Sequence, residues 1–130
     1  MRAYEVLQRY GHTQVDTEHL LLALIEQPDG VIPEILRQLG VDIEGVSRRL
    51  DEELRRTPRS QIFGGGVGQV YITPRLKRVI DQSNEEASRL KDDYISTEHL
   101  FLAIAAERNT PAARILIEFG VTRDRILEAI

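Results

Sequence analysis

The chain has 130 residues, of which 42% are apolar and 29% charged, and it carries a formal net charge of −4 and no cysteine. This length and composition predict one globular domain and exclude a disulfide framework, a thiolate nucleophile and a cysteine-based zinc site. The acidic balance argues against a nucleic-acid partner, and no apolar run approaches the roughly 20 residues that would span a membrane.

Four helices are predicted in the first part of the chain. Asp16 is a good N-cap, because its carboxylate can accept hydrogen bonds from the free amides of the turn that follows. The helix after it is apolar on all sides, which is typical of a buried central helix. Gly40 suits the left-handed conformation that ends a helix, and Asp42 is expected to cap the next one. The predicted helices cover about 3–10, 17–27, 31–39 and 43–56.

A connector follows, from 57 to 72. It contains Pro58 and a glycine-rich run from Gly64 to Gly68, so it is predicted to be flexible. Its end, 70–72, is expected to lie as a short extended segment along the second part of the chain. The run is not a phosphate-binding loop, because such a loop ends in Gly-Lys-Ser/Thr and here Gln69 follows. It also lacks the third glycine of a dinucleotide-binding fingerprint.

The same plan of helices recurs after the connector. Thr73 is predicted to be an N-cap, with Pro74 at the first helical position, where a missing amide hydrogen costs nothing. Further caps are expected at Ser96, Thr110 and Thr122. The predicted helices cover about 74–91, 97–107, 111–119 and 123–130.

The two parts of the chain are copies of one another at a constant offset of eighty residues. The segment Thr17–Ala23 reads TEHLLLA and the segment Thr97–Ala103 reads TEHLFLA. The match continues without a gap to Gly40 and Gly120, which indicates a tandem duplication. The sequence therefore predicts an all-α, pseudo-twofold tandem repeat of two four-helix units in one domain, 1–130. Repeat one is predicted at 1–56, the glycine-rich linker at 57–72 and repeat two at 73–130.

The first helix is predicted to be shorter than its counterpart. The helix from Pro74 extends further before its Glu-His motif than the chain does before Glu18. The favoured interpretation is that N-terminal residues are missing. Their loss is expected to expose apolar surface near Val6 and Leu7.

No catalytic motif is visible in the sequence. The chain has neither the Gly-x-Ser-x-Gly turn of a nucleophilic serine nor the His-Glu-x-x-His pair of a zinc enzyme. His19 and His99 stand at equivalent positions near two helix starts. They are more readily explained as packed, locally hydrogen-bonded side chains than as metal ligands. The sequence predicts a non-enzymatic domain with no metal or cofactor of its own.

Glu18 and Glu98 are the candidate binding residues. An acidic side chain in the first turn of a helix is favoured by the helix dipole by about 0.3–1 kcal/mol, which suffices to explain one glutamate. The alternative is that each carboxylate lies at a groove and binds cationic groups of a partner. Asp92 and Asp93 add negative charge before Glu98, so the second repeat is the favoured contact.

The paired Thr-Glu-His-Leu-x-Leu-Ala motifs, each followed by an Ile-Leu and a Gly-Val pair, resemble the N-terminal domain of the Clp ATPases. Two further segments carry the likeness, QVYITPRL at 69–76 and DYISTEHL at 93–100. The glycine-bearing linker and the Gly-Val-Thr at 120–122 resemble the ClpB-type disaggregase. The intact motif in both copies is equally similar to the ClpC-type unfoldase that feeds a protease. The ClpB type is the favoured interpretation.

The resemblance implies a cytoplasmic, all-α domain tethered to a hexameric, ATP-driven AAA+ ring. In that family the domain receives unfolded or aggregated polypeptide, or an adaptor that delivers it. ATP and Mg belong to the ATPase modules of the parent chain. A groove that combines apolar side chains with a few carboxylates would bind unfolded chains weakly and with little sequence preference.

The resemblance also implies site residues. In ClpC-type domains the motif glutamate and a threonine at the start of the preceding helix form part of a phosphoarginine site. This corresponds to Glu98 with Thr73 and to Glu18, whose threonine partner would precede Met1. In ClpB-type domains the residues that correspond to Glu98 and Asp92 are associated with substrate handling.

An unfolded polypeptide is expected to meet the face around Ile80 and His99. Two other classes stay open. The helix–Gly–helix turns at Gly40 and Gly120 would also suit a DNA-binding module, which the acidic charge disfavours. The chain would also suit a stand-alone Clp-like interaction protein, and whether the reading frame continues into an ATPase would decide this.

Overall fold

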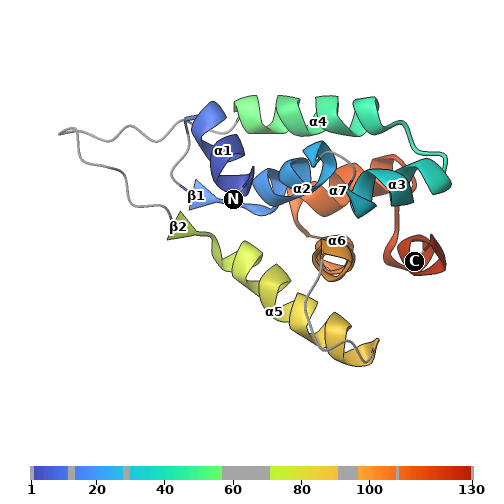
Figure 1. Cartoon of the computed structure of the whole chain (residues 1–130). Coiled ribbons are helices and arrows are strands. Elements are labelled where there is room, and N and C mark those ends of the chain that lie inside the picture. Colours follow the sequence, from blue (N-terminus) through green and yellow to red (C-terminus); the bar gives the residue numbers. More distant parts are fainter. Residues whose placement is uncertain are drawn as a thin grey trace.

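The fold is all-α, as predicted. The computed structural model describes residues 2–11, 14–27, 30–56, 71–90, 97–107 and 109–129. In this described part, four helices belong to each repeat (Figure 1). The first four are α1 (Arg2–Arg9), α2 (Thr17–Glu26), α3 (Val31–Gln38) and α4 (Ile43–Arg56), and the second four are α5 (Pro74–Arg89), α6 (Thr97–Ala106), α7 (Pro111–Glu118) and α8 (Arg123–Ala129). The strands are β1 (Gln14–Val15) and β2 (Tyr71–Ile72).

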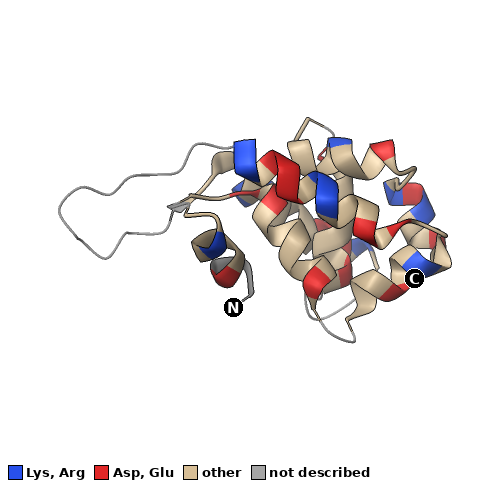
Figure 2. Ribbon diagram, turned by 90° about the horizontal axis from the view of Figure 1, so that it is seen from above, with Lys and Arg blue, Asp and Glu red and all other residues tan. Residues whose placement is uncertain are grey.

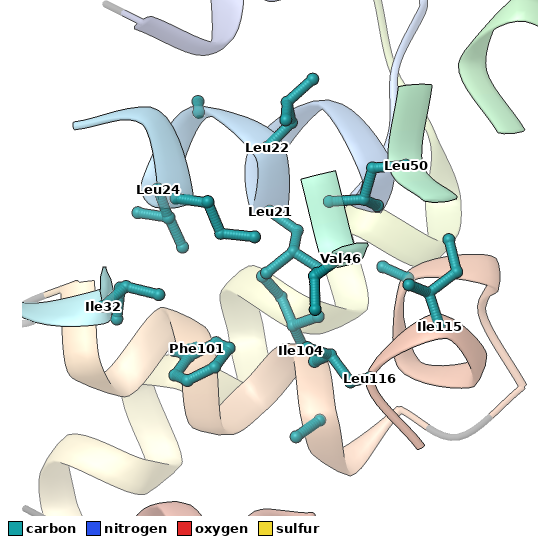
Figure 3. Packing of buried hydrophobic residues seen from close by; sticks show 14 of the residues in the cluster. Leu21, Leu22, Leu24, Ile32, Val46, Leu50, Phe101, Ile104, Ile115 and Leu116 are labelled. Atoms are coloured by element: carbon teal, nitrogen blue, oxygen red, sulfur yellow. The ribbon is translucent and has the colours of Figure 1, made fainter. Parts of the chain in front are cut away.

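The equivalent helices α2 and α6 form the centre of the molecule. Leu21 of α2 and Phe101 of α6 stand eighty residues apart in the sequence, and both are fully buried. Figure 3 shows them in one apolar cluster, which residues of α3, α4 and α7 complete. Each repeat therefore buries the apolar face of the other, and the prediction of a buried central helix at α2 is confirmed.

Most of the predicted helix ends are confirmed. The Asp16 carboxylate accepts a hydrogen bond from the Thr17 amide, and His19 Nδ1 accepts one from the Asp16 amide at 2.9 Å, which together begin α2 with a capping box. Gly40 and Gly120 end α3 and α7 with φ of 72° and 76°, the left-handed region that favours glycine. Threonine hydroxyls accept amide hydrogen bonds at three later helix starts, those of Thr73, Thr110 and Thr122.

The prediction for the end of the connector was partly wrong. Tyr71–Ile72 is extended as expected, but it pairs in parallel with Gln14–Val15 of the first repeat and does not lie along the second. The Thr73 amide continues the ladder by donating to the Val15 carbonyl at 3.1 Å. This pairing is non-local, so local propensities do not reveal it. The rest of the predicted connector, 57–70, lies outside the described residues, as does the predicted cap at 96.

Helix α1 has eight residues and α5 has sixteen, so the first helix is the shorter one, as predicted. The expectation of exposed apolar surface near Val6 and Leu7 was wrong, because each of them is only 1% exposed. Both residues belong to the common core. Arg9 also holds α1 to α2 through a bidentate ion pair with Glu26, at 2.8 and 3.0 Å. Short as it is, α1 packs against α2 and so shields the apolar side chains of Val6 and Leu7 from solvent.

Candidate binding site

The two candidate glutamates begin equivalent helices but lie in different surroundings. Glu18, in the first turn of α2, is 3% exposed, whereas Glu98, in the first turn of α6, is partly exposed. The helix dipole favours a carboxylate at either position. The neighbouring elements therefore decide what each carboxylate can do.

Glu18 belongs to a polar cluster that joins the two repeats, named here the Asp16 cluster and formed by Asp16, Glu18, Thr73 and Arg75. Arg75, the second residue of α5, donates from Nε to both carboxylate oxygens of Asp16, at 2.7 and 2.9 Å, and its Nη2 donates to the same group. The Thr73 hydroxyl donates to Asp16 Oδ1 at 3.0 Å. Glu18 Oε1 accepts from the Thr17 hydroxyl at 2.6 Å, and Glu18 Oε2 lies 3.7 Å from Arg75 Nη2.

The two carboxylates of this cluster respond differently to burial. Burial raises the pKa of Glu18, because one hydroxyl hydrogen bond and the more distant guanidinium do not replace the lost hydration. Burial also acts to raise the pKa of Asp16, but the hydrogen bonds from Arg75, the Thr17 amide and Thr73 outweigh it, so this pKa is lowered. The surroundings of Asp16 therefore stabilise its ionised form, whereas those of Glu18 destabilise its ionised form.

Glu98 lines a groove of about 510 Å³, named here the Glu98 groove. The lining residues are Gly30, Val31, Glu34, Ile35, Arg37, Gln38, Glu98 and Ala129. Val31 is 44% exposed and gives the groove an apolar surface. Glu34 and Arg37 form an ion pair with each other at 2.9 Å, so their charges largely cancel. No cation of the described residues lies within ion-pair distance of the Glu98 carboxylate.

The position equivalent to the Glu98 groove in the other half of the molecule is bridged by an ion pair between two helices. Gln38 and Ala129 line the Glu98 groove, and their repeat equivalents are Glu118 and Arg49. Arg49 binds Glu118 in a bidentate manner, at 2.9 and 3.0 Å, and so ties α4 to α7. An amide and a methyl side chain cannot form such a pair, so α8 is not tied to α3 at this point.

Thr73 lies near the end of α6, whereas Glu98 lies at its start. Its hydroxyl donates to Asp16, and α5 and α6 run antiparallel, since Arg78 near the start of α5 lies 3.9 Å from Glu107 at the end of α6. The structure therefore places Thr73 on Asp16, in the cluster that contains the motif glutamate of the other repeat, Glu18, and not beside Glu98.

The remaining predicted site residues do not line the Glu98 groove. Ile80 is partly buried against the core, and His99 is 2% exposed. Asp92 lies outside the described residues, so its role stays a prediction. His19 hydrogen-bonds locally, as predicted.

The sequence reasoning missed Arg75 and Val31. Arg75 reaches Asp16 because β2 pairs with β1, a non-local contact that local patterns do not encode. The groove did have a usable signal in the sequence. The oppositely charged Arg49 and Glu118 of one half correspond to a methyl and an amide side chain in the other.

The charges of the described surface are mixed. Acidic and basic residues are interspersed over the face seen in Figure 2, and Arg55 of α4 pairs with Asp51 at 2.8 Å. The described part of the chain holds no group of three or more His, Asp or Glu side chains suited to a metal ion. Among the described helices, none has both the length and the apolarity to cross a bilayer.

Comparison with known proteins identifies a family. The chain matches the family described as the Clp repeat (R) N-terminal domain over residues 1–119. It is 35% identical over 126 residues to the chaperone protein ClpB of Nitratidesulfovibrio vulgaris. It is 32% identical over 129 residues to the negative regulator of genetic competence ClpC/MecB of Bacillus subtilis. These matches cover 96% and 98% of this chain but only 15% of the length of each relative.

Two solved structures share the fold. The Hsp104 N-terminal domain from Candida albicans has a TM-score of 0.80 at 19% identity, over 98% of this chain and 81% of that one. The N-terminal domain of the ClpV1 ATPase from E. coli has a TM-score of 0.78 at 22% identity, over 98% and 76%. The fold, the duplicated motif and these matches agree. The chain belongs to the Clp repeat (R) N-terminal domain family, the family of the N-terminal domains of Clp ATPases.

Proposed function

We propose that this domain captures unfolded or aggregated polypeptide in the Glu98 groove, directly or through an adaptor, for an ATP-dependent Clp chaperone. The observation that carries the proposal is the state of Glu98. Its carboxylate has no ionic partner among the described residues and shares its groove with the exposed side chain of Val31. This combination suits a polypeptide that offers a basic and an aliphatic side chain together.

The expected affinity is low. Burying one leucine or phenylalanine side chain of a client contributes roughly 1.5–3 kcal/mol, and a partly exposed ion pair adds about 0.2–1 kcal/mol. The cost of ordering a disordered chain opposes both contributions. Weak, reversible capture suits a domain that hands its client onward.

The family supports the rest of the proposal. The parent chain would supply a hexameric AAA+ ring that binds ATP and Mg, and this domain would be its non-enzymatic, cytoplasmic receptor, with neither nucleic acid nor membrane as a partner. Disaggregation of the ClpB type is the favoured activity. The ClpB of Nitratidesulfovibrio vulgaris, at 35% identity, is slightly more similar than the ClpC/MecB of Bacillus subtilis, at 32%.

A second candidate function is a ClpC-type role, in which the domain binds adaptors or phosphoarginine-tagged proteins for proteolysis. One observation favours it. Glu18, the repeat equivalent of Glu98, lies 3.7 Å from the guanidinium of Arg75. The start of α2 therefore accommodates an arginine side chain beside Glu18. Glu98, at the equivalent start of α6, could bind an arginine of another protein through the same carboxylate group.

An amide-resolved NMR titration with a disordered peptide that carries one arginine between two leucines tests the proposal. The peptide is expected to shift the amide signals of Val31 and Glu98. Replacing its arginine by citrulline, which is uncharged and similar in shape, should weaken binding about two- to fivefold, as expected for a loss of about 0.5–1 kcal/mol. The Glu98→Gln variant should bind both peptides equally.

Two further variants complete the experiment. Glu85→Gln removes an exposed carboxylate of α5 outside the groove and should bind like the wild type. The double variant Gln38→Glu, Ala129→Arg copies the ion pair of the other half and should close the groove with Glu98 unchanged, so binding of both peptides should fall. Unchanged signals of Glu98 in every titration would contradict the proposal. So would a Glu98→Gln variant that still prefers the arginine peptide.

Free phosphoarginine separates the two candidate functions. Saturable shifts at Glu98, at concentrations where free arginine produces none, would favour the ClpC-type role. A response to the peptide without a response to phosphoarginine would favour a receptor for exposed polypeptide.

A further inference from the structure

Glu86 of α5 is a buried carboxylate that belongs neither to the Glu98 groove nor to the Asp16 cluster. It is only 1% exposed. Arg123, the first residue of α8, donates to both of its oxygens, from Nε at 2.9 Å and from Nη2 at 2.7 Å. Arg89, whose side chain is largely exposed, donates to the same carboxylate at 3.1 Å. The buried charge is therefore compensated, and its bidentate partner belongs to another helix.

The corresponding positions of the first repeat carry apolar side chains. At the offset of eighty residues, Glu86 corresponds to Val6 and Arg123 to Ile43. Val6 is 1% exposed, and Ile43 packs against the core. The fold therefore fills these two positions without any charge. Replacing a buried ion pair by well-packed apolar residues is commonly neutral or stabilising, whereas bidentate hydrogen bonds fix the geometry of a contact. Stability alone thus does not account for the pair.

The pair fixes the start of the helix that forms one wall of the Glu98 groove. Arg123 begins α8, and Ala129, six residues further on, lines the groove. The other polar tie of α8, from Arg125 to the Leu39 carbonyl at 3.1 Å, also lies in its first turn. The methyl side chain of Ala129 forms no polar contact that would fix the wall itself. About 9 Å of helix separates the two positions, so a tilt of about 10° at the start moves the wall by about 1.5 Å.

We propose that Glu86 is a positioning residue of the Glu98 groove. Through Arg123 it sets the orientation of α8, and thereby the distance between Ala129 and the facing helix α3. The consequence for binding rests on the proposed function of the groove, whereas the consequence for the orientation of α8 does not. Because Glu86 lines no part of the groove, its replacement changes the binding surface only by moving α8.

The double variant Glu86→Val, Arg123→Ile separates positioning from stability, because it copies the residues of the first repeat. Its midpoint of thermal unfolding should equal or exceed that of the wild type, since two apolar side chains replace a buried ion pair. The disordered peptide with one arginine between two leucines should nevertheless bind at least about threefold more weakly, because a site that is displaced by 1 Å or more is no longer preorganised. Amide-resolved NMR titration measures the affinity.

Residual dipolar couplings of the amides of α8 measure the orientation directly. Compared with the couplings of α6, they should fit a different orientation in the double variant than in the wild type, while those of α3 and α7 fit unchanged. Glu85→Gln replaces an exposed neighbour of Glu86 and should leave both the couplings and the affinity as they are in the wild type.

Glu86→Gln is a second test, which keeps the shape of the side chain. Glutamine retains one oxygen that can accept from Arg123, but its amino group cannot accept the second hydrogen bond. The start of α8 is then held by one bond in place of two. The couplings of α8 should decrease relative to those of α6, and the peptide should again bind more weakly than to the wild type.

Two results would overturn the proposal. One is a folded variant, double or single, in which α8 gives the couplings of the wild type. The other is a variant whose α8 has changed its orientation but whose affinity for the peptide has not changed. Failure of the proposed function looks different, because the wild type would then give no response to the peptide at Glu98, while the couplings of α8 would still change in both variants.

Discussion

Asp16 and Glu18 affect stability in opposite directions, although they share one cluster. Despite burial, hydrogen bonds lower the pKa of Asp16. Its ionised form therefore stabilises the fold above the ordinary value of 3.8, and this contribution is lost as the pH falls below that value. Burial raises the pKa of Glu18, so the folded chain holds this proton more tightly than the unfolded chain does. Stability consequently falls as the pH rises from below the ordinary value of 4.5 through the raised one.

We expect Glu18→Gln to raise the midpoint of thermal unfolding at pH 7. Glutamine keeps an oxygen that can accept from the Thr17 hydroxyl, and it removes the buried charge. The gain should shrink as the pH approaches 4.5 and disappear below it, where Glu18 is itself protonated. Thermal unfolding across this pH range measures the effect, with Glu85→Gln as the exposed control. A Glu18→Gln variant that is less stable than the wild type at pH 7 would show that the attraction to Arg75 outweighs burial.

At the scale of residues, the sequence predicted the positions of Glu18 and Glu98 but not their surroundings. Both glutamates can be read directly from the duplicated motif. Whether each one is buried depends on which side chain of the other repeat lies over it. Arg75 covers the first because of a strand pairing between distant segments, and no local pattern encodes that pairing.

At the scale of elements, the equivalent turns after α3 and α7 have different roles. Gly40 and Gly120 share the left-handed conformation. A Cβ at Gly40 would meet nothing within 4 Å, whereas one at Gly120 would lie 3.2 Å from Arg125 Nη1. Arg125 donates to the Gly120 carbonyl at 2.7 Å and to the Leu39 carbonyl at 3.1 Å, and so ties α8 to the end of α3. Glycine is therefore needed at position 40 only for its backbone conformation, whereas at position 120 it also leaves room for the side chain of Arg125.

Gly40→Ala should lower the free energy of unfolding by about 1 kcal/mol, the cost of a left-handed backbone for a residue with a Cβ. Gly120→Ala should cost more, because the guanidinium of Arg125 must also move. Gly40→Asn should recover part of the loss, since asparagine tolerates this conformation. Urea denaturation of the three variants measures these differences. Equal losses for the two alanine variants would mean that the Arg125 contact adds nothing.

The elements themselves were predictable, because their start signals act within a few residues. Asp16, Thr73 and Thr110 cap the helices that were expected to follow them. The errors concern contacts between elements. Apolar surface was expected to be exposed near Val6 and Leu7, and only the packing of α1 on α2 shows that both residues are buried.

At the scale of the whole molecule, the two repeats are interlocked. Helices α2 and α6 share one core, and β1 pairs with β2 across the repeats. Ion pairs of Asp16 with Arg75 and of Arg49 with Glu118 join the same two halves. Neither repeat buries its apolar face alone, so the chain is expected to unfold as one cooperative unit.

Phe101→Ala should lower the free energy of unfolding by about 3–5 kcal/mol, because this side chain is fully buried in the shared core. Amide signals of Ile35 in α3 and Ile115 in α7 should disappear together, at a lower urea concentration than in the wild type. Ile117→Ser changes an apolar residue of α7 that is 49% exposed, and should cost no more than about 0.5 kcal/mol. Loss of α7 while α3 persists would contradict cooperative unfolding.

The fold of the whole chain was predictable because a tandem duplication leaves few compact arrangements for two four-helix units. The duplication alone does not predict the Glu98 groove, because the groove reflects a difference between the repeats that appears only when their equivalent residues are compared. Arg49 of α4 pairs with Glu118 of α7, whereas the equivalent residues of the other half, Ala129 and Gln38, cannot form an ion pair.

That ion pair has a consequence for how a duplicated chain can change over evolutionary time. Where Arg49 holds Glu118, a substitution disturbs the joint between two helices, so selection for a folded molecule is expected to restrain both positions. Gln38 and Ala129 carry no such joint and line an open surface. Under the proposed function, these two positions are expected to change with the partner that the groove binds. The two copies of one ancestral segment would then come under different constraints, one set by the stability of the fold and the other by the partner.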